Sequence, residues 1–199
     1  MSAREDILAT IRARRANTVP APPPYRAPVI ADRVQAFAER ARLANAEVRF
    51  IASDAEAPPA IAELLRARNL PAVVHMPANA SALPWNSAPG LTLERDAPGP
   101  DDAAVAIASF GIAETGTLAY PSGSAAPASW HFRAGFEIAV IRADSILPHM
   151  EDVLARLNAN GLPSTVNFVT GPSRTGDIEQ TLELGAHGPK ALAILIVWS

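Results

Sequence analysis

Hydroxyl, glycine and charged residues gather in the last third of the chain, over residues 170–189. Ser173 and Thr175 stand in a loop rich in glycine and proline, with Arg174 between them. Hydroxyls and free backbone N–H groups in such a loop can bind a carboxylate or phosphate, and a cation adds to the attraction. The same hydroxyls can instead cap a helix, and Arg174 can be a solvated loop residue. This loop, which includes Gly171, is our first candidate for an anion-binding site.

Two carboxylates, Asp177 and Glu179, follow this loop at the start of a helix predicted over residues 177–184. Acids in a first helical turn are favoured by the helix dipole, by about 0.3–1 kcal/mol each. They can also act as a general acid or base, and Asp177 is the better candidate because it lies nearer the loop. The predicted helix is about 12 Å long, so His187, which follows it, should lie far from Ser173. We therefore interpret His187 as a turn residue.

A second polar stretch, Glu114-Thr115-Gly116-Thr117, interrupts an apolar region. A carboxylate buried there would have a raised pKa unless it were paired, and catalytic acids need such an environment. The alternative for Glu114 is a structural salt bridge, or a carboxylate that accepts backbone N–H groups. Gly116 permits either a tight backbone turn or the close approach of a ligand. Ser122 and Gly123, after the next strand, either add N–H donors to the same anion site or form a surface turn.

His131 lies beside aromatic residues after a loop of Pro, Ser, Gly and Ala. It could close over the site, or bind a metal together with Glu114. No spacing typical of metal ligands supports the second reading, so we expect no metal. His75 and His149 are expected to be structural.

Composition excludes several classes of function. The 199 residues include no cysteine, so disulfides, thiolate nucleophiles and cysteine-bound iron–sulfur clusters are excluded. Neither a G-x-G-x-x-G dinucleotide fingerprint nor a Walker A loop is present. The net charge of −3 argues against a nucleic-acid binder. No apolar run is long enough to span a membrane and no signal-peptide core is visible, so we expect a soluble, cytoplasmic protein.

Helical and strand-like patterns alternate along the chain, which predicts an α/β fold with a largely parallel sheet. We expect residues 1–28 to form a helix and a Pro-rich arm, which packs on the domain or a second subunit or stays a mobile tail, and residues 29–199 to form one domain. The predicted helices are 3–16, 32–45, 58–68, 149–158 and 177–184. The predicted strands are 48–52, 72–75, 91–93, 103–108, 116–120, 136–141, 166–169 and 191–198.

The two polar motifs carry a family resemblance. TGPSRTGDIEQTLELGAHGP over residues 170–189, together with IAETGTL over residues 112–118 and Ser122-Gly123, resembles the lactate utilization protein C family, which carries the LUD domain. The resemblance covers roughly residues 100–198. It implies a three-layer sandwich around a central sheet, like that of NagB, RpiA and the CoA transferases. Many members have a proline and a histidine where this chain has Ala134, Gly135 and Glu137, so substrate contacts from that region do not carry over.

The resemblance implies an accessory component of L-lactate (2-hydroxy acid) oxidation that acts with iron–sulfur partner proteins. Because the chain has no cysteine, a partner would carry the clusters. Its own role would be to bind a small carboxylate or acyl ligand at the Ser173/Thr175 loop and Glu114. One alternative is a free-standing acyl/CoA transferase or sugar-phosphate enzyme of the same fold, with Glu114 or Asp177 doing the chemistry. A second is a non-catalytic scaffold for a redox partner. The sequence is also compatible with a homo-oligomer.

Overall fold

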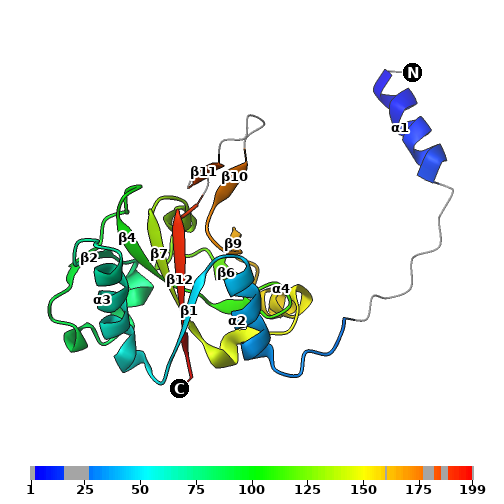
Figure 1. Ribbon diagram of the computed structural model, residues 1–199. Coiled ribbons are helices and arrows are strands. Elements are labelled where there is room, and N and C mark those ends of the chain that lie inside the picture. Colours follow the sequence, from blue (N-terminus) through cyan, green and yellow to red (C-terminus); the bar gives the residue numbers. More distant parts are fainter. Residues whose placement is uncertain (1–2, 16–26, 160, 177–181, 185–187, 199) are drawn as a thin grey trace.

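A computed structural model describes residues 3–15, 27–159, 161–176, 182–184 and 188–198 of the chain (Figure 1). Its centre is a six-stranded sheet in which every pair of neighbouring strands is parallel. The prediction of an α/β fold with a largely parallel sheet is therefore confirmed. In spatial order the strands are β1 (Glu47–Ile51), β12 (Ala191–Val197), β7 (Phe136–Arg142), β4 (Ala103–Ile107), β2 (Val73–His75) and β3 (Thr92–Glu94).

A smaller, mostly antiparallel sheet lies beside the main one. It orders β8 (Ile146–Leu147), β5 (Phe110–Ile112), β6 (Thr117–Pro121) and β9 (Val166–Val169). β9 pairs with β6 in the antiparallel sense, with Leu118 opposite Val169. The expectation that β9 and β12 form one parallel strand–helix–strand unit is wrong, since β9 belongs to this second sheet.

Between β9 and β12, the two described strands pair with each other as a hairpin. β10 (Arg174–Gly176) pairs antiparallel with β11 (Leu182–Leu184), and Thr175 lies opposite Glu183. The helix predicted over residues 177–184 is therefore wrong at its described end, where the chain is extended. The two acids favoured a helical first turn only weakly, whereas strand pairing satisfies the backbone groups of both arms. Asp177 and Glu179 lie outside the described residues.

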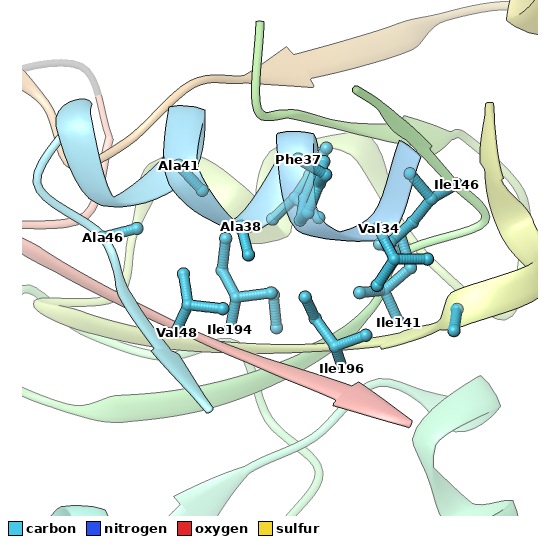
Figure 2. Packing of buried hydrophobic residues seen from close by; sticks show 14 of the residues in the cluster. Val34, Phe37, Ala38, Ala41, Ala46, Val48, Ile141, Ile146, Ile194 and Ile196 are labelled. Carbon is cyan, nitrogen blue, oxygen red and sulfur yellow. The ribbon is translucent and has the colours of Figure 1, made fainter. Parts of the chain in front are cut away.

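Two helices cover opposite faces of the main sheet, α2 (Arg33–Leu43) and α3 (Ala57–Ala67). Alternate residues of β12 divide between them, because successive side chains of a strand point to opposite faces. Ile194 and Ile196 pack with Phe37 and Ala38 of α2 (Figure 2), while Leu195 belongs to the cluster that includes α3. Both faces are buried, which explains why the strands are continuous apolar runs. With α2 and the second sheet on the same side, the molecule is a three-layer α/β sandwich.

Local signals set the bounds of α2. Asp32 precedes the helix, and its carboxylate accepts a hydrogen bond from the Gln35 backbone N–H at 2.9 Å, the usual role of an N-cap acid. Arg40 and Arg42 lie in the last turn, where cations complement the helix dipole. Asn45, with φ at 67°, turns the chain into β1.

Besides the N-terminal helix, the described residues also form α4 (Met150–Ala159), which packs on the second sheet, and five short 3-10 turns. Val153 and Leu157 of α4 are buried against Ile112 and Leu147. Met150 and Leu154 of the same helix are about 36% and 44% exposed. The 3-10 turns are η1 (Asp54–Glu56), η2 (Ala78–Ala82), η3 (Trp85–Ser87), η4 (Ala128–Phe132) and η5 (Ala143–Ser145).

The N-terminal helix is α1 (Ala3–Arg15), as the sequence predicts. Its apolar residues Ile7, Leu8 and Ile11 are exposed, and none of them belongs to a buried cluster. The boundary between an arm and a domain near residue 28 stays a prediction. Among the helices in the described ranges, none has both the length and the apolar composition needed to cross a membrane.

Candidate functional site

The two polar motifs meet at the end of the second sheet. The β6–β9 register places Thr117, at the start of β6, next to Thr170, which follows β9. Their Oγ1 atoms are 2.6 Å apart, and the Thr115 Oγ1 lies 2.7 Å from that of Thr117. A chain of three hydroxyls therefore joins the loop at residues 114–117 to the loop at residues 170–173. Residues more than 50 positions apart in the sequence form one local structure.

The glycines of both motifs pack against the carboxyl end of α2. Gly116 has φ at 69° and Gly171 has φ at 72°, a region that favours glycine. A Cβ on Gly116 would lie 2.3 Å from the Ala41 backbone N, and one on Gly171 would lie 2.1 Å from the Ala44 carbonyl O. The backbone at the end of α2 therefore lies close to both glycines and leaves no room for a side chain there. For Gly116, of the two readings that the sequence leaves open, the structure shows the tight backbone contact.

A cavity of about 170 Å³ opens beside the loop at residues 170–173. Ser173 and Gly188 both line it and lie against each other, since a Cβ on Gly188 would be 3.2 Å from the Ser173 Cβ. The Ser173 backbone N–H donates to the Pro189 carbonyl at 2.9 Å. The full lining is His131, Phe132, Phe168, Val169, Thr170, Gly171, Pro172, Ser173, Gly188 and Pro189.

The hairpin explains why the sequence placed the end of this motif wrongly. A crossover helix would have carried the chain away from Ser173, but β11 runs antiparallel to β10 and brings it back. Gly188 and Pro189 therefore lie against Ser173 and not across the sheet from it. His187, the residue before Gly188, lies outside the described residues, and its predicted role as a turn residue is untested.

A buried polar cluster adjoins the cavity, and His131 is its member in the cavity lining. Glu137, at the start of β7, is fully buried, and His131 and Tyr120 are about 5% and 4% exposed. The Tyr120 hydroxyl donates to Glu137 Oε1 at 3.0 Å, and His131 Nδ1 lies 3.1 Å from Glu137 Oε2. The rings of Tyr120 and His131 stack with centroids 3.8 Å apart. Each carboxylate oxygen therefore has a partner, as a buried carboxylate requires.

Burial controls the ionisation of Tyr120. The loss of hydration, the negative charge of Glu137 and the hydrogen bond to that carboxylate together raise the pKa of the Tyr120 phenol well above its usual value near 10. Tyr120 therefore stays protonated at physiological pH and remains a hydrogen-bond donor to Glu137.

The partner of His131 is Glu137, which the sequence analysis does not predict as a site residue. His131 was expected to close over the site or to bind a metal with Glu114, but its partner is Glu137. A signal was present, because Glu137 is the only charged residue inside the apolar run FEIAVI. A lone carboxylate in a buried strand needs a donor, and a histidine six residues earlier is a natural candidate.

Glu114 lies apart from the cavity, at the amino end of α4. Its Oε2 is 2.8 Å from His149 Nδ1, and its Oε1 accepts from the Met150 backbone N–H at 3.1 Å. The hydrogen bond with His149 is the main cause that lowers the pKa of Glu114; burial acts against it and the Met150 N–H assists. The geometry matches the paired, N–H-accepting alternative for Glu114. His149, expected to be structural, is the partner.

Two other predicted ligand-binding residues lie at the far end of β6. The Ser122 backbone N–H donates to the Thr165 carbonyl at 2.8 Å, and its Oγ accepts from the Thr165 N–H at 3.1 Å. Gly123 pairs with Ala126 in a small turn. Thr117 and Ser122 therefore mark opposite ends of one strand, and Ser122 and Gly123 do not line the cavity. Arg174 and Thr175 belong to β10, next to the cavity loop, and Arg174 is exposed.

Metal binding finds no support in the described ranges, where no group of three or more His, Asp or Glu side chains is arranged to hold an ion. The cavity instead offers one imidazole, backbone groups and the exposed aromatic side chains Phe132 and Phe168. Its volume is below the roughly 300–1,000 Å³ of sites for drug-sized ligands. This arrangement can bind a small polar molecule and can exchange a proton with it.

Comparison with known proteins links these motifs to one family. The LUD domain model matches residues 101–197. The chain is 35% identical over 101 residues to "Lactate utilization protein C" of Halalkalibacterium halodurans, and 32% identical over 118 residues to the protein of the same name from Geobacillus thermodenitrificans. These matches cover 48% and 57% of this chain and 44% and 49% of the relatives. The chain thus spans about half the length of the curated relatives it matches.

A solved structure shares the fold. The crystal structure of a DUF162 family protein from Deinococcus radiodurans matches with a TM-score of 0.63 and 24% sequence identity. The match covers 85% of this chain and 99% of that one. The likeness extends well beyond residues 101–197 and includes most of the two-sheet body.

Proposed function

We propose that the chain, which matches the LUD domain model over residues 101–197 and resembles the proteins named lactate utilization protein C, takes part in the oxidation of L-lactate or another 2-hydroxy acid. In this proposal the protein is an accessory component that acts with iron–sulfur partner proteins. Its own contribution is to bind a short-chain hydroxy acid in the cavity between His131 and Ser173. The chain holds no cluster of its own and acts in the cytoplasm.

The single observation that carries the proposed ligand site is the convergence of His131 with the loop at residues 170–173 and Gly188 on one small cavity. The family signature contributes the loop, and the buried cluster contributes a polar group. At about 170 Å³ the cavity suits a short acid better than a nucleotide or a CoA ester. The composition supports the division of labour, since a chain without cysteine offers no thiolates for a cluster.

Ligand-induced stabilisation tests the proposal. A ligand that binds only the folded state raises the melting temperature by mass action, and even weak binding shows at high concentration. We would screen L-lactate, glycolate, pyruvate, acetyl-CoA and sugar phosphates against the purified full chain. A shift with the short acids alone supports the proposal. A shift with acetyl-CoA or sugar phosphates alone would favour the enzyme alternatives of the same fold, and no shift at all would favour a scaffold.

A charge placed at the cavity wall locates the site. Phe132 lines the cavity and is about 52% exposed, so the fold should tolerate a polar residue there. Phe132→Glu adds a negative charge that repels an acid, whereas Phe132→Gln has nearly the same shape without the charge. The expected result is that the lactate-induced shift is lost with Phe132→Glu and kept with Phe132→Gln. Equal responses of the two variants would place the ligand elsewhere.

A further inference from the structure

His131 is a polar side chain held in one orientation inside the protein. Tyr120 stacks on its ring with centroids 3.8 Å apart, and Glu137 Oε2 lies 3.1 Å from Nδ1. The ring is about 95% buried, given its 5% exposure. A 180° flip of the ring would replace the Nδ1 contact to the carboxylate with a carbon. The carboxylate and the stacked ring therefore fix which nitrogen faces Glu137.

The carboxylate also fixes the position of the proton. A carboxylate whose other oxygen already accepts from the Tyr120 hydroxyl can only accept from Nδ1, so Nδ1 carries the hydrogen. In the neutral imidazole, Nε2 then has a lone pair and acts as an acceptor. Within the described residues His131 makes no further polar contact, and its Nε2 atom is not fully enclosed by protein. His131 also lines the cavity.

An acceptor in the cavity selects for a donor on the ligand. We infer that His131 Nε2 accepts the hydrogen bond of a ligand hydroxyl, so that the cavity distinguishes a 2-hydroxy acid from its 2-keto counterpart and from the acid that lacks the hydroxyl. This inference rests on the proposed function and names the group that reads the substrate class. Glu137 is the positioning residue, because it acts on the ligand only through the orientation of His131.

A purely structural role for His131 is the competing explanation. The same side chain lines a second cavity of about 10 Å³, close to the volume that one water molecule needs. Asn79 and Trp130 line this small cavity, and among the described residues their buried Oδ1 and Nε1 atoms have no hydrogen-bond partner. A water there could also satisfy Nε2. In that case the loss of His131 would change stability but not ligand preference.

Calorimetric titration of the full chain with L-lactate, pyruvate and propionate separates these cases. Wild type is expected to bind lactate roughly tenfold or more tightly than propionate and pyruvate, because an unpaired acceptor in the cavity is costly. His131→Asn retains an amide near Nδ1 but removes Nε2, so lactate affinity should fall to that of propionate while propionate affinity stays within about twofold. His131→Gln, whose amide reaches the Nε2 position, should recover part of the preference.

Two further variants keep the test decisive. His75→Asn makes the same change at a second buried histidine outside this cavity and should leave the lactate preference intact. If His131→Asn does not fold, Glu137→Gln supplies the test, since an amide can offer N–H to Nδ1 and so move the ring hydrogen to Nε2. The preference for lactate over pyruvate should then be lost.

The outcomes separate this inference from the proposed function. If lactate, pyruvate and propionate bind wild type equally, or His131→Asn leaves the preference unchanged, the inference about His131 is overturned and the acid-binding cavity stands. If none of the three binds, the proposed site and the inference both fail. A lactate preference that disappears with His131→Asn and persists with His75→Asn establishes His131 as the residue that reads the hydroxyl.

Discussion

Glu114 and His149 form an ion pair whose geometry demands a charged imidazole. His149 Nδ1 lies 2.8 Å from Glu114 Oε2, and Nε2 lies 2.9 Å from the Pro28 carbonyl. Both partners are acceptors when Glu114 is ionised, so both ring nitrogens must donate. The hydrogen bond to Glu114 is the main cause that raises the pKa of His149; desolvation opposes it, and the Pro28 carbonyl assists.

The pair should stabilise the fold most strongly in mildly acidic solution. Glu114 has a lowered pKa, so its contribution is present above its ordinary value of 4.5 and is lost as pH falls through the lower folded value. His149 has a raised pKa, so its contribution is present below 6.5 and is lost as pH rises through the higher folded value. Both contributions are complete between about 4.5 and 6.5.

The variant Glu114→Gln isolates this effect. NMR titration of the His149 ring should give a pKa above 6.5 in wild type and a lower one in the variant, because the charge and the stronger acceptor are gone. Urea unfolding from below pH 4.5 to above pH 6.5 should show a flatter stability profile for Glu114→Gln. An unchanged His149 titration would mean that the pair does not form in solution.

Tyr120 should resist ionisation until the protein unfolds. The sequence has two tyrosines, so Tyr25→Phe leaves Tyr120 as the sole phenol. Its pKa is raised in the fold, so the stabilisation it gives is present below the ordinary value near 10 and is lost as pH rises above it. Phenolate absorbance should therefore appear together with the loss of secondary structure. An ordinary titration curve in the folded protein would contradict the buried contact with Glu137.

At the residue scale, the sequence identified the polar residues of the sites better than the side chains with which they pair. Glu114 and His131 stand out from composition alone, since each interrupts or borders apolar residues. Their partners, His149 and Glu137, depend on how α4 begins and how η4 leads into β7. Side-chain pairing is decided by the tertiary positions of those elements, which residue types do not encode locally. The sequence therefore predicted polar sites but did not identify Glu137 as the partner of His131.

Among the elements, the apolar strands were the most predictable. β4, β7 and β12 are buried on both faces, so nearly every residue is apolar and the pattern is unambiguous. The segment after β9 was not predictable in this way. Its glycine, proline and acids are equally typical of a helix start and of a hairpin. The hairpin is favoured by contacts outside the segment, such as the one between Ser173 and Pro189.

Glycines with the same backbone conformation should differ in tolerance according to what they face. Gly116 and Gly161 have φ at 69° and 85°, so alanine costs about 1–2 kcal/mol at either position through strain alone. At Gly161 no atom of the described residues lies within 4 Å of the added Cβ, whereas at Gly116 it meets the α2 backbone at 2.3 Å. The free energy of unfolding should fall by about 2–5 kcal/mol for Gly116→Ala, since overpacking adds to strain.

Chemical denaturation of the two alanine variants measures this difference, with Gly161→Ala as the matched control. The comparison removes the backbone contribution, which both variants share. Equal losses of stability would show that the turn at Gly116 is not packed on α2. A selective loss at Gly116 would support a structural reason for this motif glycine, independent of any ligand.

The whole molecule places the cavity where its two sheets adjoin. Tyr120 comes from the second sheet, Glu137 from the amino end of β7, and Pro189 from the turn into β12. The cavity thus lies near the amino ends of the parallel strands β7 and β12, and its loop at residues 170–173 follows the carboxyl end of β9. The second sheet brings Tyr120 next to the strands of the main sheet, and the alternation of helices and strands in the sequence does not predict this second sheet.

The N-terminal part of the chain should be separable from this body in two steps. The buried clusters begin with Ile30 and Val34 and include no residue of α1. A chain that starts at Ala27 should therefore unfold cooperatively at a melting temperature within a few degrees of the full chain. If α1 and its exposed apolar residues dock on another subunit, the shorter chain should differ in oligomeric state, which light scattering measures.

A chain that starts at Asp32 extends the argument, because it also removes the Pro28 carbonyl and the packing of Ile30. Loss of that carbonyl takes away one cause that raises the pKa of His149, so the ring should titrate at lower pH than in the chain that starts at Ala27. The free energy of unfolding should fall as well, because removal of Ile30 leaves apolar surface of the α2 cluster uncovered. If the two shortened chains have the same His149 titration and the same stability, the folded domain begins at Asp32. A difference in both would show that residues 27–31 belong to the body and that the arm ends before them.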